Sequence, residues 1–425
     1  DPYDATCTED GYWGSYSTCN RVGCDYTSKL DRYVEKALGH LIKHFDAKEP
    51  DCLPGWEAYD ECQREGCDFT TKVVLPANGK HSYVCDVCTT CNELNPVRYT
   101  RDGNYINFGY WPQTLERDEN VIAKLNEMAG TPPLPRDKEN PYNWESHEGT
   151  TYMWQKIVIY NGTKYLGVQM NDYRASGVYA LSSYIMKNGY FTYEVYWFKY
   201  EPIKWRILTT SGNSAFIMSD IALDSFSIQP DRKSENRDGL FAEYNNSTGV
   251  PDGTYANNWE YCFLRSWLNE TFYNEVFNKL QKEIIQTTHL DNTARSSNPN
   301  DYPKYYGYGE NAGKNKFADQ CKDTDDKIFL LSLRDITTTA YGFNKDVKAE
   351  DPARNLQATD FAKLHGAPMN TNDKKYVTWY TRSPAPANGN QGYATFVLDR
   401  HAKGAMGSID LTPDGGVVPA LWITL

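Results

Sequence analysis

The segment "WYTRSPAPANGNQGYATFVLDRHAKGAMGSIDLTPDGGVVPALWITL" occupies residues 379–425. Both of its ends are apolar and rich in aromatic residues, whereas its middle mixes polar, charged and small residues. The stretches "YATFVLD" and "VVPALWITL" within it predict two strands, because alternation and β-branched or aromatic residues are typical of strands. The sequence therefore predicts a polar segment held between two apolar ones.

The composition of the whole chain limits its class. Its 425 residues include 40% hydrophobic and 14% aromatic residues, which is enough to build a core. The formal net charge of -12 argues against a nucleic-acid partner, because phosphates are bound by basic surfaces. The chain contains no apolar run of about 18 residues or more, so we expect no membrane span.

Cysteine is concentrated at the start of the chain, where an internal repeat also lies. "YSTCNRVGCDYTSKL" (residues 16–30) matches "YDECQREGCDFTTKV" (residues 59–73), and "CDVCTTC" (residues 85–91) ends the run as a truncated third unit. We therefore divide the chain into a Cys-rich repeat region, residues 1–97, and a large domain, residues 98–425. The nine cysteines of the repeat region are Cys7, Cys19, Cys24, Cys52, Cys62, Cys67, Cys85, Cys88 and Cys91.

These nine cysteines have two interpretations. Units this small cannot bury a core alone, so cross-links are expected. Disulfides would each contribute roughly 2–4 kcal/mol. Structural zinc is the alternative, because the C-x4-C and C-x2-C spacings suit zinc, with His40 or His81 as a further ligand. The repeats resemble the small Cys-and-"ALGH" modules of bacterial surface proteins, which implies a secreted or cell-surface spacer.

The large domain reads as a mixture of strands and short helices joined by long polar loops. The sequence predicts a strand over residues 105–114 that breaks at Pro112, and a helix over residues 115–130 that stops at Gly130. It also predicts a hairpin over residues 153–170 that turns at Asn161 and Gly162. Further predictions are two strands within 195–224, a helix over 263–285, a strand over 326–336 and a short helix over 358–366.

The ordered blocks "FGYWPQ", "VYWFKYEPIKWRIL", "LRSWLNETFY", "DKIFLLSL", "TDFA", "YTRSP" and "GVVPALWITL" run through the large domain. This series resembles a bacterial domain of uncharacterised function, related to the C-type-lectin fold in its formylglycine-generating-enzyme-like form. The resemblance covers about residues 98–425 and implies an α+β fold. Some members are variable proteins of diversity-generating retroelements, in which codons close to the end of the chain are rewritten.

The resemblance implies a ligand-binding protein whose partner is a protein or a glycan, and whose C-terminal surface is hypervariable. The framework would include Trp379, Arg382, Pro419 and Trp422. The predicted ligand-binding residues are Asn388, Asn390, Gln391, Tyr393, Thr395, Asp399, Arg400, His401, Lys403, Met406, Ser408 and Asp410. Arg265 lies inside another apolar block, "FLRSWLN", so we expect its charge to be paired.

Catalysis is the main alternative. The related oxidases need a redox-active cysteine pair in the C-terminal half of the domain, whereas the last cysteine here is Cys321. No other catalytic motif occurs, so we expect no enzyme, although an enzyme on this scaffold or a structural surface component stays open. Lectins of this broad fold often bind calcium through a Gln-Pro-Asp triplet, which occurs at residues 229–231. "DTDD" (residues 323–326) is predicted to be a solvated loop, with calcium binding as the alternative.

Overall fold

The computed structural model describes residues 3–15, 17–28, 31–130, 153–170, 182–191, 194–229, 248–293, 320–370, 374–385, 394–399, 405–410 and 415–425. The chain divides into two compact units. The first comprises Asp1–Tyr83 with Val87–Glu93, and the second comprises Val84–Asp86 with Leu94–Leu425. Across the described residues, no helix has the length and apolar character that crossing a bilayer requires.

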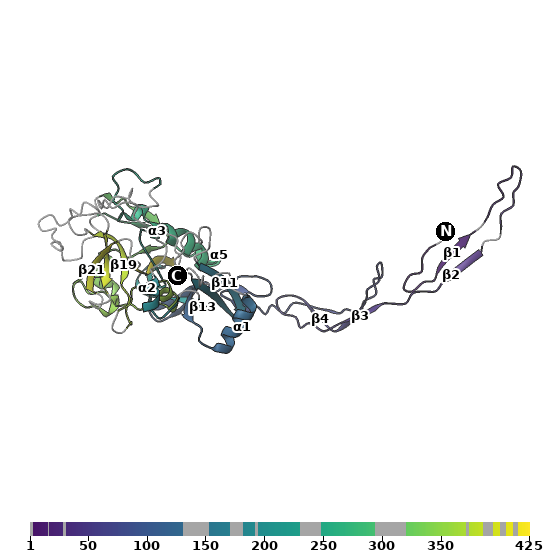
Figure 1. Ribbon diagram of the computed structural model, residues 1–425, viewed down its shortest axis with the longest axis horizontal. Helices are drawn as coiled ribbons and strands as arrows, with labels where there is room; N and C mark the ends of the chain where they lie inside the picture. The colour runs from purple at the N-terminus through teal and green to yellow at the C-terminus, as the bar shows by residue number, and fades with distance from the viewer. Residues whose placement is uncertain are drawn as a thin grey trace, which may run out of the picture. The chain divides into compact units, whose positions relative to one another are not determined.

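The first unit contains short two-stranded ribbons (Figure 1). Its strand pairs are β1 (Gly11–Ser15) with β2 (Asp31–Glu35), β3 (Ile42–Phe45) with β5 (Tyr59–Cys62), and β4 (Gly55–Trp56) with β6 (Val74–Leu75). β7 (Tyr83–Val84) and β8 (Val87–Cys88) form a further pair at its end. The buried hydrophobic side chains of this unit, among its described residues, are Tyr59 and three cysteines, Cys7, Cys62 and Cys88. Sulfur therefore occupies the place that aliphatic side chains take in an ordinary core.

The second unit has a mixed α+β architecture in which one large sheet is central. The strands β11 (Met153–Tyr160), β12 (Thr163–Met170), β13 (Val195–Ser211), β14 (Ser214–Ser219), β23 (Pro419–Thr424) and β18 (Phe329–Leu330) lie in that order. β10 (Tyr105–Leu115) pairs with β13, and β9 (Thr100–Asp102) pairs with β10. The long strand β13 joins the two parts of this sheet, because its first half pairs with β12 and its second half pairs with β14.

A second sheet of five strands carries the C-terminal segment (Figure 1). Its order is β15 (Asp224–Phe226), β22 (Gly415–Val417), β19 (Trp379–Ala385), β20 (Ala394–Asp399) and β21 (Ala405–Asp410). β20 and β21 form an antiparallel pair at one edge of the sheet, next to β19. The two strands predicted at the end of the chain are thus confirmed, and they belong to different sheets.

Several local predictions for the large domain are confirmed. Helix α1 (Glu119–Ala129) begins after Asp118, whose carboxylate accepts hydrogen bonds from two backbone N–H groups of the first turn, and it is capped by Gly130. β11 and β12 form the predicted hairpin, and its turn residues Asn161 and Gly162 both have positive φ, as the tight turn requires. Helix α6 (Asp360–Leu364) is the predicted short helix, capped by Thr359.

Two other predictions are wrong for identifiable reasons. β10 does not break at Pro112, because a register shift between Pro112 and Thr114 allows the strand to continue in its pairing with β13. Gly109 in the same strand has φ 68°, and a Cβ there would collide with the side chains of Val276 and Phe277. The strand predicted over 326–336 is reduced to β18, which is followed by a 3-10 turn, η8 (Asp335–Thr337).

The single helix predicted over residues 263–285 is instead a series of short segments. α3 (Phe263–Trp267) runs into a π-helical turn, η4 (Leu268–Phe272), and then into α4 (Tyr273–Val276). Phe277 is extended, and Asn278 starts α5 (Lys279–Lys282) with a capping box to Gln281. The apolar spacing of the sequence was that of one helix, but the capping residue Asn278 begins a new one.

One continuous core lies in the second unit and contains large aromatic side chains that are fully buried. These are Phe108, Phe198, Trp205, Trp259, Phe272, Trp379 and Tyr380. The core draws on both sheets and on the helical segments between Trp259 and Lys282. A smaller cluster under α1 is formed by Leu125, Val158, Tyr165 and Trp197.

Candidate functional site

Two groups of four side chains in the repeat region can each hold a metal ion. The first, cluster A, consists of Cys7, His40, Cys62 and Cys67. The second, cluster B, consists of Cys52, His81, Cys88 and Cys91. Within each cluster the four candidate ligand atoms lie within 4.8 Å of one another.

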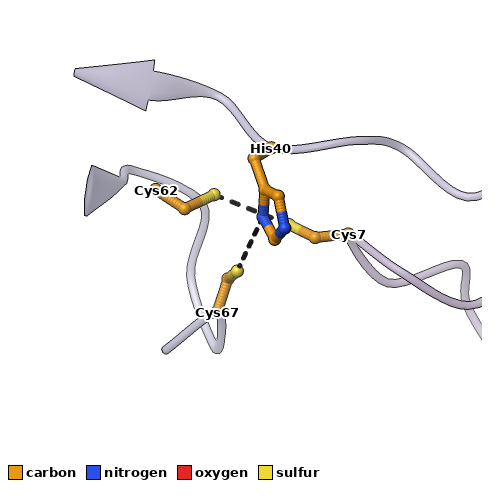
Figure 2. A group of neighbouring side chains, drawn as sticks. All are labelled: Cys7, His40, Cys62 and Cys67. Carbon is orange, nitrogen blue, oxygen red and sulfur yellow. Dashed lines mark hydrogen bonds between the residues drawn. The ribbon is translucent and has the colours of Figure 1, made fainter. Parts of the chain in front are cut away.

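The distances in cluster A are those of co-ligands rather than of bonded sulfurs. The Sγ atoms of Cys7 and Cys62 are 3.6 Å apart, and the Sγ of Cys67 lies 3.3 Å from Nδ1 of His40, so all four groups point to one place (Figure 2). A disulfide would need about 2.05 Å between sulfurs. Two thiolates on a tetrahedral zinc ion, each at about 2.3 Å, lie about 3.8 Å apart.

Cluster B repeats this geometry with other residues. The Sγ atoms of Cys52 and Cys88 are 3.6 Å apart, and the Sγ of Cys91 lies 3.4 Å from Nδ1 of His81. Across the described part of the repeat region, none of the nine cysteines is disulfide-bonded. The spacing of the sulfurs therefore favours the metal interpretation of these six cysteines over the disulfide interpretation.

Local backbone contacts bring the ligands of cluster A together. The N–H of Gly39 donates to the carbonyl of Cys7 (3.1 Å), which places His40 beside that cysteine. The loop between Cys62 and Cys67, which we call the Cys62 loop, is closed by the N–H of Cys67 donating to the carbonyl of Arg64 (3.2 Å). Cluster A therefore joins one Cys and one His from one repeat unit to a Cys pair from the next.

Hydrogen bonds within each cluster favour the thiolate of one cysteine, whereas burial beside the other thiols raises the pKa of Cys7 in cluster A and of Cys52 in cluster B to about 12. Burial raises the pKa of Cys62, but the backbone N–H of Arg64 and the side chain of His40 hold that pKa at about 6. In cluster B the backbone N–H of Cys91 is the main cause that lowers the pKa of Cys88 to about 5. Metal-bound cysteine is a thiolate, so donors of this kind favour the liganding form.

The three other cysteines of the repeat region belong to neither cluster. Cys19 and Cys24 lie together on a loop near the start of the chain. Cys85 lies in a turn with φ 49°, and burial raises its pKa to about 11. The sequence grouped all nine cysteines as metal or disulfide residues, whereas the structure gathers only six of them into complete clusters.

The predicted ligand-binding residues fall partly on the hairpin of β20 and β21. Thr395 and Asp399 lie on β20, and Met406, Ser408 and Asp410 lie on β21. The others lie outside the described residues: Asn388, Asn390, Gln391, Tyr393, Arg400, His401 and Lys403.

The register divides the five hairpin residues into two sets. Thr395 and Asp399 pair with Ile409 and Ala405. Met406, Ser408 and Asp410 pair instead with Leu398, Phe396 and Ala394. Directly paired residues share a face of an antiparallel ribbon, so the two sets belong to opposite faces of the hairpin.

The strand that precedes the hairpin is rigidly held. All seven residues of β19 are buried, and the indole N–H of Trp379 donates to the carbonyl of Arg354 (2.9 Å). Arg382 is 7% exposed and donates to the Asn292 side chain (3.1 Å), to the Leu330 carbonyl (2.7 Å) and to Asp335 (3.0 Å). Arg382 thus ties β19 to β18 and to the segment that follows it.

The last strand, β23, is anchored by the other two predicted framework residues. Pro419 pairs with Leu330 of β18. The ring of Trp422 stacks on Phe216 of β14, with ring centroids 5.2 Å apart. The hairpin of β20 and β21 therefore lies between two chain segments that are fixed in the core.

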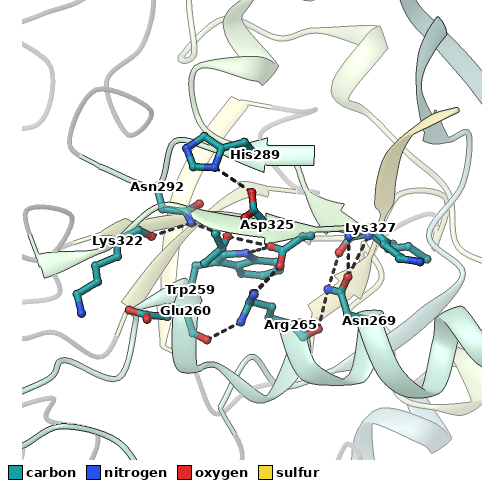
Figure 3. Close-up of polar contacts among 12 residues, drawn as sticks. Trp259, Glu260, Arg265, Asn269, His289, Asn292, Lys322, Asp325 and Lys327 are labelled. Atoms are coloured by element: carbon teal, nitrogen blue, oxygen red, sulfur yellow. Dashed lines mark hydrogen bonds and ion pairs between the residues drawn. The ribbon is translucent and has the colours of Figure 1, made fainter. Parts of the chain in front are cut away.

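Arg265 anchors a second buried network (Figure 3). Its guanidinium donates to Asp326 (2.7 Å) and to the carbonyl of Glu260 (2.9 Å). Asp326 is 1% exposed and also accepts hydrogen bonds from Trp259 Nε1 (2.9 Å) and Thr324 Oγ1 (3.0 Å). The charge of Arg265 is paired, and the network fixes the entry to α3.

The same network corrects the prediction for residues 323–326. Instead of a solvated loop, Thr324–Asp326 form β17, which pairs with β16 (Thr288–Leu290). Asp325 stays exposed and contacts His289 (2.9 Å), whose pKa is raised by this hydrogen bond. In the triplet at 229–231, Gln229 is buried and its side-chain oxygen accepts from the N–H of Phe263 (3.2 Å), whereas Pro230 and Asp231 lie outside the described residues.

A cavity of about 730 Å³ in the second unit was not foreseen from the sequence. Its wall combines an Asp224–His365 pair, joined at 2.6 Å and almost fully buried, with Glu275, whose pKa is raised by burial and by the charge of Asp224. The Nε1 of Trp111 is buried on the same wall without a hydrogen-bond partner among the described residues. The aromatic side chains that line the cavity are Trp111, Tyr200, Phe226, Trp267 and Phe361.

The two cysteines of the large domain do not resemble exposed nucleophiles. Cys262 and Cys321 are both buried. Burial raises the pKa of Cys262 to about 12, which leaves it a neutral thiol at ordinary pH. This environment is that of a structural cysteine rather than of a reactive one.

Residues 212–425 match the family described as a domain of unknown function, DUF6273. The match spans half of the chain, so the chain belongs to this family. The matched part includes β19 to β23 and the Arg265 and Arg382 networks, and it excludes the repeat region. The chain matches no curated protein and no solved structure.

Proposed function

We propose that this protein is a secreted or cell-surface ligand-binding protein that displays its C-terminal hairpin on a C-type-lectin-like scaffold. One observation carries the proposal: β20 and β21 form the edge of a sheet, directly beside a strand that is buried at all seven residues. A recognition segment needs a rigid support, because ordering a loose segment on binding costs free energy.

The hairpin has the position that such a segment needs. Among the described strands, β21 pairs only with β20, so the outer edge of β21 has no strand neighbour there. Gly415, just after the hairpin, lies against the ring of Tyr380 so closely that a Cβ would collide with it. This contact holds β22 against β19 without involving the hairpin, so we infer that substitutions in the hairpin leave the packing of β19 and β22 unchanged.

The ligand that we propose is a protein or a glycan. The net charge of -12 disfavours nucleic acid. The diversity-generating retroelement that the sequence resemblance implies would act on this hairpin and its flanking residues, and it would alter the ligand without altering the framework. An enzyme on this scaffold is less well supported, because the thiol of Cys262 is buried and neutral.

We further propose that clusters A and B hold structural zinc. Three thiolates and one imidazole make a complete tetrahedral set, which is typical of structural rather than catalytic zinc. The repeat region buries few apolar side chains besides the ligand cysteines, so the metal would supply the stabilisation that a core normally gives. Each ion would link consecutive repeat units into one spacer.

Binding by hairpin variants tests the main proposal. The full chain is applied to a glycan array and to a panel of purified extracellular proteins. Wild type is compared with a variant that carries Thr395→Ala and Asp399→Ala, and with one that carries Met406→Ala and Ser408→Ala. Lys124→Ala on α1, 56% exposed, is the control.

We expect at least one hairpin variant to lose at least tenfold in affinity for a bound ligand, with its melting temperature unchanged. The control should bind like wild type. Equal binding by all four proteins would refute a ligand site on the hairpin.

A second binding site is favoured by the aromatic wall of the cavity. A small ligand with an apolar face, such as a sugar, would pack on this wall. Thermal-shift titration with a panel of monosaccharides tests this. Tyr200→Ala should weaken any shift that wild type shows, and an identical shift in both proteins would exclude a contact with this wall.

A further inference from the structure

Cys19 and Cys24 lie on a loop that matches the Cys62 loop in sequence. "CNRVGC" (residues 19–24) corresponds to "CQREGC" (residues 62–67) in the repeat. We call residues 17–28 the Cys19 loop. The equivalent pair, Cys62 and Cys67, supplies two ligands of cluster A.

The two loops also share one backbone conformation. The N–H of Cys19 donates to the carbonyl of Tyr26 (2.9 Å), as the N–H of Cys62 does to that of Phe69 (3.0 Å). The N–H of Cys24 donates to the carbonyl of Arg21 (3.0 Å), which repeats the closing contact of the Cys62 loop. Gly23 and its counterpart Gly66 have φ values of 84° and 76°. The Cys19 loop is therefore already folded as a two-thiol ligand loop.

The clusters follow one rule that leaves the Cys19 loop incomplete. Each cluster takes its Cys pair from one repeat unit and a further Cys and His from the preceding unit. Cys7 and His40 serve the Cys62 loop, and Cys52 and His81 serve the pair Cys88 and Cys91. The Cys19 loop would need a Cys and a His from a preceding unit. Among the described residues no such pair is left for it, because Cys7 and His40 already belong to cluster A.

Exposure of the Cys19 loop is the second, independent observation. Phe69 stacks on the imidazole of His40, with ring centroids 4.2 Å apart, and is 38% exposed. Its counterpart Tyr26 is 67% exposed. In the second repeat unit β5 is paired with β3, and Tyr59 stacks on Phe45 and is only 6% exposed. In the first repeat unit the corresponding residues 17–19 are in no strand of the described chain. The face that would receive a preceding unit is uncovered.

We propose that Cys19 and Cys24 form half of a third zinc site, completed by one thiolate and one imidazole from another repeat unit of the same kind. The proposal rests on the zinc assignment of clusters A and B. The incoming unit adds a strand beside residues 17–19 and stacks its imidazole on Tyr26. Its source is either an upstream unit of the same polypeptide or a unit of another molecule. The site thus links repeat units end to end.

Zinc stoichiometry of the full chain tests the half-site. Reduced, metal-free protein is titrated with Zn²⁺, and bound ions are counted by native mass spectrometry. Wild type is compared with Cys19→Ser/Cys24→Ser and with the matched variant Cys62→Ser/Cys67→Ser. We expect three ions on wild type, the third the weakest, and two on Cys19→Ser/Cys24→Ser. The matched variant should instead lose a tightly bound ion.

A mixing experiment identifies the source of the missing ligands. The donor is a variant with Cys19, Cys24, Cys62 and Cys67 all changed to Ser, which releases Cys7 and His40 from cluster A. Wild type should form a zinc-dependent 1:1 complex with this donor, and Cys19→Ser/Cys24→Ser should not. Zinc-dependent dimers of wild type alone would show instead that two Cys19 loops share one ion, and would overturn the assignment of a Cys and a His as the missing ligands.

The half-site and the zinc assignment fail in different ways. Two ions on both wild type and Cys19→Ser/Cys24→Ser would overturn the half-site and leave clusters A and B intact. No zinc on any of the variants would overturn the zinc assignment itself. Because the count is made on each protein directly, poor folding of the donor does not decide the outcome.

Discussion

Substitution of Arg382 by Met tests the framework beneath the hairpin most sharply. Arg382→Met keeps much of the side-chain volume and removes every donor of the guanidinium. The carbonyl of Leu330 and the side-chain oxygen of Asn292 would then lose a donor in a buried place. Asp335 would keep its hydrogen bonds from Ser332 and is 22% exposed, so its loss is smaller.

The expected cost follows from these contacts. A buried acceptor left without a donor costs about 1–3 kcal/mol, and breaking a buried ion pair costs about 3–5 kcal/mol. Because Asp335 is partly exposed, breaking its ion pair costs less than a fully buried pair would. We therefore expect Arg382→Met to destabilise the protein by about 3 kcal/mol. With an unfolding entropy of about 2.1 cal/mol/K per residue, a unit of the size of the second one would show a fall in melting temperature of roughly 4 °C.

Thermal unfolding followed by circular dichroism measures this change. The control is Arg117→Met, because Arg117 also pairs with an aspartate, Asp360, but is 67% exposed. Its loss should cost under about 1 kcal/mol. Equal melting temperatures for the two variants would contradict the reasoning, since the difference between them depends on the burial of Arg382.

Two further predictions concern a carboxylate and the metal clusters. Glu116 is 7% exposed; burial raises its pKa, but the N–H of Asp118 and Lys199 hold the pKa below the usual 4.5. Glu116→Gln should therefore lower the free energy of unfolding by about 2 kcal/mol above pH 4.5. The difference from wild type should vanish as the pH falls through the lowered pKa of Glu116. Urea unfolding at several pH values measures it, and a difference independent of pH would contradict a stabilising role of the ionised carboxylate. Chelation of metal should make the repeat region sensitive to limited proteolysis, but not residues 98–425. Cys62→Ser should have the same effect at cluster A alone. Unchanged cleavage after chelation would show that metal does not stabilise the repeats.

Much of the fold of the large domain could be predicted because its signals are local. Asp118 as a cap and Asn161 with Gly162 as a turn depend on a few neighbouring residues. Predictions failed where contacts between distant residues determine the secondary structure. The continuation of β10 through Pro112 depends on a register shift against β13, and residues 324–326 form a strand because Asp326 pairs with Arg265.

The candidate sites were predictable in residue type but not in grouping. The repeat identified the cysteines, and His40 and His81 were named as ligands. No sequence pattern indicates that each cluster takes ligands from two consecutive repeat units, because ligands such as Cys7 and Cys67 are far apart in the chain. The cavity was missed since Trp111, Asp224 and His365 come from separate elements.

The central claim is that the hairpin can change while the framework holds it, and the melting temperature of a multiply substituted hairpin tests this most directly. A variant with Thr395, Asp399, Met406, Ser408 and Asp410 all replaced by Ala is compared with wild type and with Arg382→Met. The account predicts a melting temperature within about 2 °C of wild type, since substitutions outside the core usually change stability by no more than about 0.5 kcal/mol in either direction, so that five of them partly cancel. A fall as large as that of Arg382→Met would contradict it, because the hairpin would then be part of the core.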